Sequence, residues 1–232
     1  MTYIENIAQD GFVVVDSVVD LTTLQLLERQ LAQFNGIASQ RAGKTFGIRN
    51  LMNAVPVTRT LANSDSLRSL VEPILSKSAR VVRGIYFDKH TDANWKVAWH
   101  QDLTIAVRER IDVDGFSAWS VKAGITHVQA PLAVLENMLT LRLHLDDTGE
   151  WNGALRVLPG THRVGRLDAN QIQHWKQRQQ TITCAVNRGG VVAMRPLLLH
   201  SSLPSLNPGH RRVLHFEYAA ADLPSSLEWF ES

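Results

Sequence analysis

Residues 140–146 read Thr-Leu-Arg-Leu-His-Leu-Asp, so apolar and polar side chains alternate along the stretch. Successive side chains of a β-strand point to opposite faces, and the pattern therefore predicts a strand with its three leucines on one face. The other face carries Arg142, His144 and Asp146. If the leucines pack against a helical layer, Arg142 enters an internal pocket.

Further short segments of β-type sequence surround this strand from Ala79 onward. Turn residues such as Asn152-Gly153 separate them. Several short strands divided by turns predict an all-β barrel or sandwich, which one helix at about 168–179, capped by Asp168, interrupts. The predicted strands are 81–87, 95–104, 138–145, 154–158, 181–186, 191–194 and 212–219.

The first third of the chain is predicted to be helical after one strand at 11–15. Asp20 can cap the first helix, and a second begins near residue 64, with Pro73 as a kink or an early end. Residues 41–57 between the two helices are expected to form loop and short strand. These helices are expected to cover one face of the β-barrel.

Composition and patterning limit the class of protein. The 24 Lys and Arg against 22 Asp and Glu give a net charge of +2, which excludes a strongly cationic nucleic-acid binder. The single Cys184 fits a small buried hydrophobe in a reducing compartment. Without a signal peptide or an apolar run of roughly 18 residues, we expect a cytoplasmic protein with no membrane partner. No linker divides residues 1–232, so we expect a single domain, whose oligomeric state the sequence leaves open.

Residues 108–131 have no clean period and are long for a connection within one domain. Loops of this length are usually lids or binding loops, so the segment is interpreted as an active-site lid. The alternative is a surface excursion that packs on itself.

A chemically informative motif, Trp-His-Gln-Asp, occupies residues 99–102 in a predicted strand. Alternation places His100 and Asp102 on one face, and His200 follows the predicted strand 191–194. Two histidines and one carboxylate form the facial triad of non-haem Fe(II) oxygenases. An isolated His-x-Asp also occurs as a hydrogen-bonded pair, but Arg211, near the next strand, adds a guanidinium that can grip a carboxylate.

These residues belong to a longer set of motifs that follow one another over nearly the whole chain. In order they are Gly11-Phe-Val-Val-Val15, Trp99-His-Gln-Asp102, Asn152-Gly-Ala-Leu-Arg-Val-Leu-Pro-Gly-Thr-His162, Gly189-Gly-Val-Val-Ala-Met194, and His200 followed by Arg211. In this arrangement the sequence resembles the phytanoyl-CoA dioxygenase-like family of Fe(II)/2-oxoglutarate-dependent oxygenases.

The resemblance implies a double-stranded β-helix, a jelly-roll or cupin-like barrel. It implies that His100, Asp102 and His200 are the catalytic iron ligands and that Arg211 holds the C5 carboxylate of 2-oxoglutarate. The partners are then dioxygen and a small-molecule substrate, whose C–H bond is hydroxylated. Related halogenases lack the carboxylate ligand, so the intact Asp102 argues against halogenation, whereas desaturation and cyclisation stay open.

Two features depart from the family pattern. Arg211 and Arg212 stand in tandem, and on a strand only one can face the pocket, the spacing favouring Arg211. Relatives often carry an aromatic residue near the co-substrate where this chain has Arg142, which we therefore count with the cofactor-binding residues. Lys96 joins them if it shares the face of His100, from which it is four residues removed, or else it is an exposed lysine at the strand start.

Three further residues are assigned to the substrate side of the pocket. Arg49 is a cation in an uncharged stretch, and Trp119 and His127 lie in the predicted lid. If Lys96, Arg49 and Arg142 all face the cavity, the positive charge exceeds what 2-oxoglutarate requires, which indicates a polar or anionic substrate. The alternatives are a core position for Trp119 and a hydrogen-bonded imidazole for His127.

Two other functions fit the same metal ligands. The first is a non-redox metal-dependent barrel enzyme, an isomerase or hydrolase, against which Arg211 and the order of the motifs argue. The second is a sensor that binds the metal and the 2-oxo acid without turnover. An assay of 2-oxoglutarate consumption separates these from an oxygenase.

Overall fold

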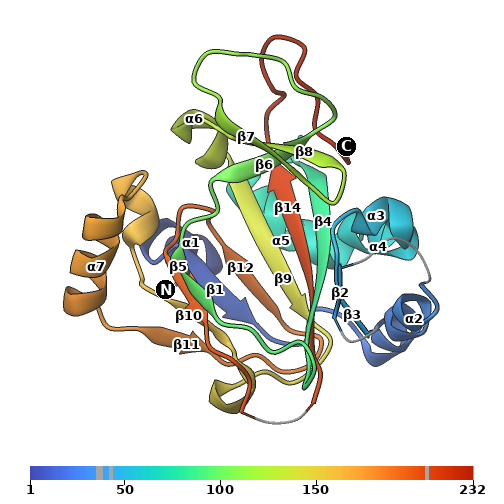
Figure 1. The fold of residues 1–232 in the computed structure, drawn as a ribbon. Helices are drawn as coiled ribbons and strands as arrows, with labels where there is room; N and C mark the ends of the chain where they lie inside the picture. Colours follow the sequence, from blue (N-terminus) through green and yellow to red (C-terminus); the bar gives the residue numbers. More distant parts are fainter. Residues whose placement is uncertain (35–38, 42–43, 207–208, 232) are drawn as a thin grey trace.

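The computed structural model describes residues 1–34, 39–41, 44–206 and 209–231 (Figure 1). Its strands pair antiparallel in two larger sheets and one small one. The seven-stranded sheet has the order β1 (Phe12–Val15), β12 (Val191–Met194), β9 (Met138–His144), β14 (Arg211–Ala219), β4 (Arg80–Lys89), β3 (Lys44–Ile48) and β2 (Ser39–Arg41). The four-stranded sheet has the order β11 (Ile182–Cys184), β10 (Leu155–Val157), β13 (His200–Ser202) and β5 (Val97–His100).

The two larger sheets pack against each other through an apolar layer. Leu155, Val157 and Cys184 of the four-stranded sheet share one buried cluster with Val192 and Met194 of the seven-stranded sheet. The arrangement is a jelly-roll barrel, as predicted, and Cys184 is a buried free thiol within its wall.

Helices cover the outer face of the seven-stranded sheet, as expected from the sequence (Figure 1). Leu24 and Leu27 of one helix and Leu67 of another pack in one cluster with Leu141 and Leu143 of β9. The covering helices are α1 (Tyr3–Gln9), α2 (Leu21–Ala32), α3 (Leu51–Ala54), α4 (Val57–Ala62) and α5 (Asp65–Leu75).

Local signals explain where two of these helices begin and end. The Asp20 carboxylate accepts a hydrogen bond from the backbone N–H of Thr23 at 3.0 Å, which caps α2 as predicted. Pro73 lies inside α5 without ending it. The helix stops only two residues later, at Leu75, so the missing amide hydrogen affects only its last turn. Residues 41–57, expected to be loop and short strand, contain β3 but also the short helix α3, and a second short helix, α4, begins at Val57.

The central pair of strands determines which side chains reach the barrel interior. β14 pairs with β4 so that Arg211 lies opposite Lys89 at one end and Glu217 lies opposite Arg83 near the other. The side chains of all four belong to the lining of one internal pocket. Arg142 on the neighbouring β9 joins them, which confirms that it enters the pocket when the leucines of β9 face the helices.

The region from 95 to 131 differs from the prediction. The expected strand 95–104 ends at His100 as β5, Asp102 lies in the connection that follows, and the next strand, β6 (Thr104–Val107), begins at the last residue of the predicted range. Residues 108–131 contain a hairpin of β7 (Ser117–Lys122) and β8 (Ile125–Gln129), which forms a three-stranded sheet with β6 at the top of the molecule (Figure 1). The segment is therefore not a loop throughout, and its role as a lid stays a prediction.

The remaining short elements connect these sheets. They are α6 (Leu132–Leu135), η1 (Glu150–Asn152), η2 (Thr161–Val164) and α7 (Ala169–Arg178), the last close to the predicted 168–179. Among the described residues, no helix combines the length and the apolar character that crossing a membrane would require.

Candidate active site

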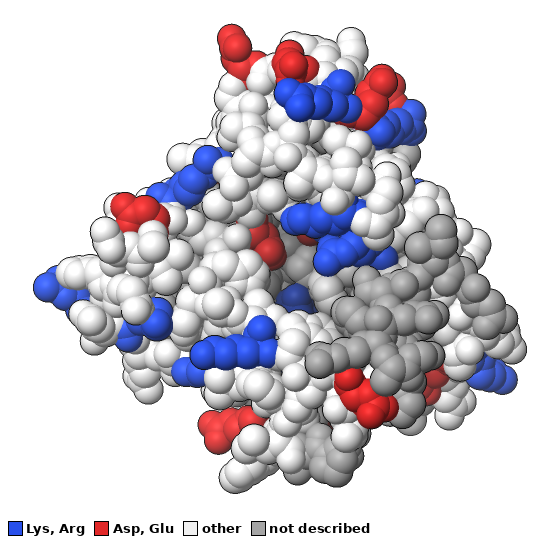
Figure 2. Space-filling view, in the orientation of Figure 1, with Lys and Arg blue, Asp and Glu red and all other residues white. Residues whose placement is uncertain are grey.

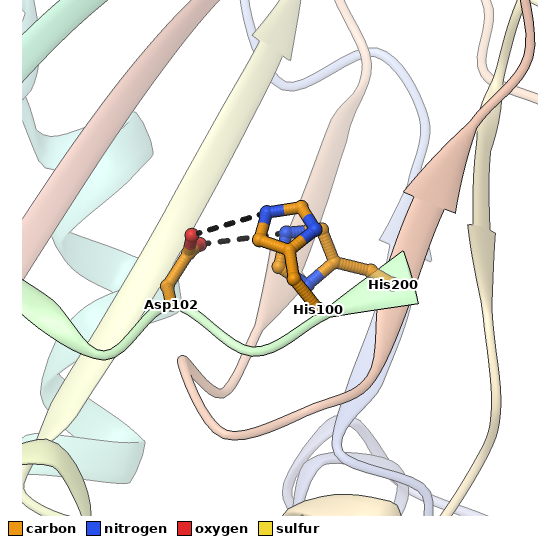
Figure 3. Close-up of side chains that lie close together, drawn as sticks. All are labelled: His100, Asp102 and His200. Atoms are coloured by element: carbon orange, nitrogen blue, oxygen red, sulfur yellow. Dashed lines mark ion pairs between the residues drawn. The ribbon is translucent and has the colours of Figure 1, made fainter. Parts of the chain in front are cut away.

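Two short strands and one connection bring His100, Asp102 and His200 together (Figure 3). His100 ends β5 and His200 begins β13, and the two are paired across the strands. The backbone N–H of Asp102 donates to the carbonyl of Pro196 at 2.9 Å, which fixes the connection beside β13. Nε2 of each histidine lies 3.6 Å from a different carboxylate oxygen of Asp102. All three ligand atoms lie within 4.8 Å of one another.

Backbone contacts define the tautomer of both histidines. Nδ1 of His100 lies 2.8 Å from the carbonyl of Ala98, and Nδ1 of His200 lies 2.8 Å from that of Leu198. A carbonyl can only accept, so each Nδ1 carries a hydrogen, and Nε2 is the nitrogen that each ring turns toward Asp102. Such backbone contacts are the usual way in which a metal-ligating histidine is oriented.

The electrostatics of the cluster fit a cation. Burial lowers the pKa of His200 to about 4, so this ring is neutral at ordinary pH. Burial by itself would raise the pKa of Asp102, but the nearby His200, His215, His100 and Arg142 lower it to about 2. The lone pair of the neutral His200 ring, Nε2 of His100 and the Asp102 carboxylate therefore converge on one point. A metal ion that prefers nitrogen and oxygen ligands satisfies this set.

The cluster opens into a cavity of about 430 Å³ between the two larger sheets. This volume lies within the range of small-molecule sites. Figure 2 shows the opening as a hollow in the middle of one face, with several basic and fewer acidic side chains at its border and within it. Six cationic side chains and two carboxylates line the cavity, namely Arg49, Arg83, Lys89, Lys122, Arg142, Arg211, Asp102 and Glu217.

Arg211 and Arg212 lie on opposite faces of β14, as alternation predicts. Arg211 lines the cavity, and its Nε and one Nη have no hydrogen-bond partner among the described residues. Burial, together with Arg142, lowers the pKa of Arg211 to about 9. Arg212 instead lies outside the cavity lining and binds Asp146 and Glu28 through its guanidinium. The donors of Arg211 are therefore available to a ligand, whereas those of Arg212 serve the fold.

Lys89 is a site residue that the sequence reasoning missed. It is fully buried, and its Nζ donates to the Ser202 hydroxyl and to the Leu203 carbonyl, both at 2.8 Å. Burial, Arg211 and Arg142 lower the pKa of Lys89 to about 7. The predicted strand 81–87 ended too early to include it. Extending the alternation of the strand by two residues would have placed Lys89 on the inner face.

A chain of polar side chains runs along the floor of the cavity. Nδ1 of His127 lies 2.9 Å from the Ile125 carbonyl and so carries the hydrogen, which leaves Nε2 to accept from Arg83 at 3.1 Å. Glu217 accepts from Arg83 at 3.1 Å and from Nε2 of His215 at 3.2 Å. Nδ1 of His215 then accepts from Arg142 at 2.9 Å. Each of these four side-chain contacts has a donor and an acceptor, so Arg83 and Arg142 are held in place.

Of the remaining predicted site residues, only some line the cavity. Arg49 lines the cavity, as expected. Lys96 does not, since it precedes β5 and is exposed, and Val97 lines the cavity in its place. Trp119 lies outside the lining, packs against the apolar cluster of the small sheet and has the guanidinium of Arg110 over its ring. His127 is fully buried and reaches the cavity only through its contact with Arg83.

Comparison with known proteins agrees with this fold. A family model described as phytanoyl-CoA dioxygenase (PhyH) matches residues 7–213. Comparison with curated protein sequences gives no significant match.

Three solved structures illustrate the similarity of fold. AviO1 from Streptomyces viridochromogenes Tue57 has 21% identity and a TM-score of 0.68, with 96% of each chain covered. EctD from S. alaskensis, crystallised with 2-oxoglutarate and 5-hydroxyectoine, has 16% identity and a TM-score of 0.73, with 94% of this chain and 74% of that chain covered. SnoN, a non-heme alpha ketoglutarate dependent epimerase from nogalamycin biosynthesis, has 18% identity and a TM-score of 0.69, with 95% and 80% covered.

Proposed function

This chain belongs to the phytanoyl-CoA dioxygenase family, and from that premise we propose that it is an Fe(II)- and 2-oxoglutarate-dependent oxygenase. The observation that carries the proposal is the convergence of two histidine Nε2 atoms and one carboxylate on a single point of the cavity wall. The metal ligands in this proposal are His100, Asp102 and His200. Iron held there supplies, together with 2-oxoglutarate and dioxygen, the oxidising power to attack an unactivated C–H bond.

Arg211 is proposed to bind the distal carboxylate of 2-oxoglutarate. Its unpartnered Nε and Nη in a buried pocket are suited to a bidentate contact with a carboxylate. Lys89, its partner across β4 and β14, places a second positive charge at the same end of the cavity. Arg142 affects the pKa values of Lys89 and Arg211 at this end and also helps to lower that of Asp102. These three side chains orient the co-substrate and exclude water from it.

We propose hydroxylation of a small polar or anionic molecule as the outcome. The intact carboxylate of Asp102 leaves no vacant ligand position for a halide, which argues against halogenation. A non-redox use of the same metal ligands leaves the buried and unpartnered donors of Arg211 without a role. In a sensor without turnover, Arg211 would still bind 2-oxoglutarate. Only a measurement of turnover therefore separates the sensor from the enzyme.

The test is formation of succinate from 2-oxoglutarate by the purified protein with Fe(II) in air. We expect the wild type to form succinate slowly without a primary substrate, and His200→Ala to form none above background. His174→Ala is the matched control, because His174 is exposed on α7 and lies outside the cavity lining. If the wild type binds Fe(II) and 2-oxoglutarate but forms no succinate even with candidate substrates, the protein is a sensor.

A further inference from the structure

The cationic side chains of the cavity fall into two groups at opposite ends of β4. Lys89 marks one end, beside Arg211, and Arg83 marks the other, beside Glu217. Arg83 lies six positions before Lys89 on the strand, so their Cα atoms are roughly 20 Å apart. The five-carbon chain of 2-oxoglutarate is much shorter than this distance. One co-substrate molecule therefore cannot occupy both groups.

Arg49 and Lys122 belong to the group around Arg83. Arg49 follows β3 and Lys122 ends β7, and both line the cavity. Arg49 also shares a surface recess with Ala123 and Gly124, which form the turn directly after Lys122. The two cations therefore reach the cavity from neighbouring segments at its mouth, where Arg49 is half-buried and Lys122 is exposed.

Acidic partners are missing for these two side chains. Arg83 is compensated, because it binds Glu217 at 3.1 Å. Among the described residues, the side chains of Arg49 and Lys122 have no hydrogen bond and no ion pair, and residues 35–46 contain no Asp or Glu. Burial and repulsion by Arg83 lower the pKa of both, and repulsion by Arg49 adds to the effect on Lys122. Attraction by Asp102 opposes the shift of the Lys122 pKa without cancelling it, so the fold holds these like charges together with little compensation.

Loading the cofactors does not remove this excess of charge. The charge of a ferrous ion cancels that of a 2-oxoglutarate dianion, and so the six cations still exceed the two carboxylates of the cavity. A cavity that is lined mainly by charges of one sign and has low-dielectric walls attracts ligands of the opposite charge. Once iron and 2-oxoglutarate are bound, the ligand that the excess positive charge can still attract is the primary substrate.

We infer that Arg49 and Lys122 form an anion-binding site for the primary substrate, a small molecule with a carboxylate or phosphate group. The inference rests on the proposed function and adds to it the class of substrate and the residues that select it. Arg49 presents a planar fork of donors and Lys122 a mobile point charge at the entrance, a combination suited to an anionic group that arrives from solvent. The C–H bond to be oxidised then lies in the part of the substrate that extends from this group toward His100 and Asp102.

The experiment measures anion binding to the protein loaded with Mn(II) and saturating 2-oxoglutarate. The probes are sulfate, which mimics a phosphate group, and acetate, which mimics a carboxylate, each titrated at low ionic strength by calorimetry and thermal shift. We compare the wild type with Arg49→Gln/Lys122→Gln and with the charge reversal Lys122→Glu. Lys176→Gln is the control, because Lys176 is an exposed lysine on α7 outside the cavity.

We expect at least one probe to bind the wild type and the control equally, and the double variant at least tenfold more weakly. The probe that binds more tightly identifies the chemical group. Lys122→Glu, at an exposed position, should also bind the probe more weakly than the wild type and the Lys176→Gln control. Binding of 2-oxoglutarate should stay within twofold in all variants.

Equal anion binding by the wild type and the double variant would overturn the inference. So would competition between the probe and 2-oxoglutarate, since that would place the anion at the Arg211 end. The same titrations on the metal-free protein distinguish a failure of this inference from a failure of the proposed function. If the wild type fails to bind 2-oxoglutarate with any metal, the proposed function is wrong, whereas the metal-free titrations still decide whether Arg49 and Lys122 bind anions.

Discussion

His100 and His200 are cross-strand neighbours in the antiparallel pair of β5 and β13, with their ring centroids 4.2 Å apart. The pairing of two short strands that lie far apart in the chain therefore creates the metal centre. A shift of this register by one residue would turn one imidazole to the other face of the sheet. The site consequently depends on the barrel being closed, and not on the local His-x-Asp motif alone.

Replacing one histidine should remove most of the metal affinity. His200→Ala leaves two of the three convergent ligand atoms, and we expect the affinity for Fe(II) or Mn(II) to fall by more than about 100-fold. His174→Ala should bind metal like the wild type. Equilibrium dialysis against a competing chelator measures both. Unchanged metal affinity in His200→Ala would place the metal elsewhere.

Replacing Arg211 should weaken ligand binding, whereas replacing Arg212 should lower stability. Arg211→Ala removes the buried, unpartnered guanidinium from the cavity, and we expect a loss of about 2–5 kcal/mol in 2-oxoglutarate binding. Arg212→Ala removes the contacts to Asp146 and Glu28, and should lower the free energy of unfolding by about 1–3 kcal/mol with little effect on 2-oxoglutarate. Calorimetric titration and urea unfolding separate the two effects. The reverse assignment of losses would contradict the orientation of β14.

Binding of 2-oxoglutarate should weaken above neutral pH because of Lys89. The pKa of this lysine is about 7 in the free protein, and a bound carboxylate favours its protonated form. By linkage, the dissociation constant rises as pH increases through about 7, by up to tenfold per pH unit. Lys89→Met should bind more weakly at pH 6.5 and should lack this rise. Calorimetry between pH 6 and 9 distinguishes the two curves.

The contribution of Lys89 to the stability of the fold should increase with rising pH. Its pKa in the folded protein, about 7, lies below its ordinary value of 10.5, so between these two pH values the unfolded chain binds more protons than the folded one. The contribution of Lys89 to the free energy of unfolding therefore increases as pH rises from about 7 to 10.5. Urea unfolding of the wild type and of Lys89→Met across this range isolates it. A constant difference between the two proteins would mean that Lys89 titrates normally.

Alternation along unbroken strands made much of the fold and part of the site predictable. The apolar run of β12 was located at its observed bounds, Val191–Met194, because Gly190 and Pro196 delimit it. The alternation at 140–146 placed the leucines of β9 toward the helices and Arg142 toward the cavity. The three residues of the metal cluster were also named, although β13 itself, with two serines in three residues, carries no pattern that predicts a strand.

Interruptions of the strands explain what could not be predicted. Lys96 was placed by counting four residues back from His100, but β5 begins only at Val97 and its pairing with β13 shifts register between His200 and Ser202. Trp119 follows Ala118, whose φ of 50° interrupts the extended backbone of β7. An even spacing indicates a shared face only within a regular strand, and local sequence does not reveal such irregularities.

The central claim is that His100, Asp102 and His200 hold Fe(II) with two positions open to 2-oxoglutarate. Anaerobic titration of the Fe(II)-loaded protein with 2-oxoglutarate, followed by visible absorption, tests it most directly, because a 2-oxo acid that chelates iron gives a metal-to-ligand charge-transfer band. We expect a weak band that saturates at one 2-oxoglutarate per iron, is unaffected in His174→Ala and is absent in His200→Ala. If the wild type binds stoichiometric Fe(II) and no band develops, the ligand arrangement serves other chemistry and the account is contradicted.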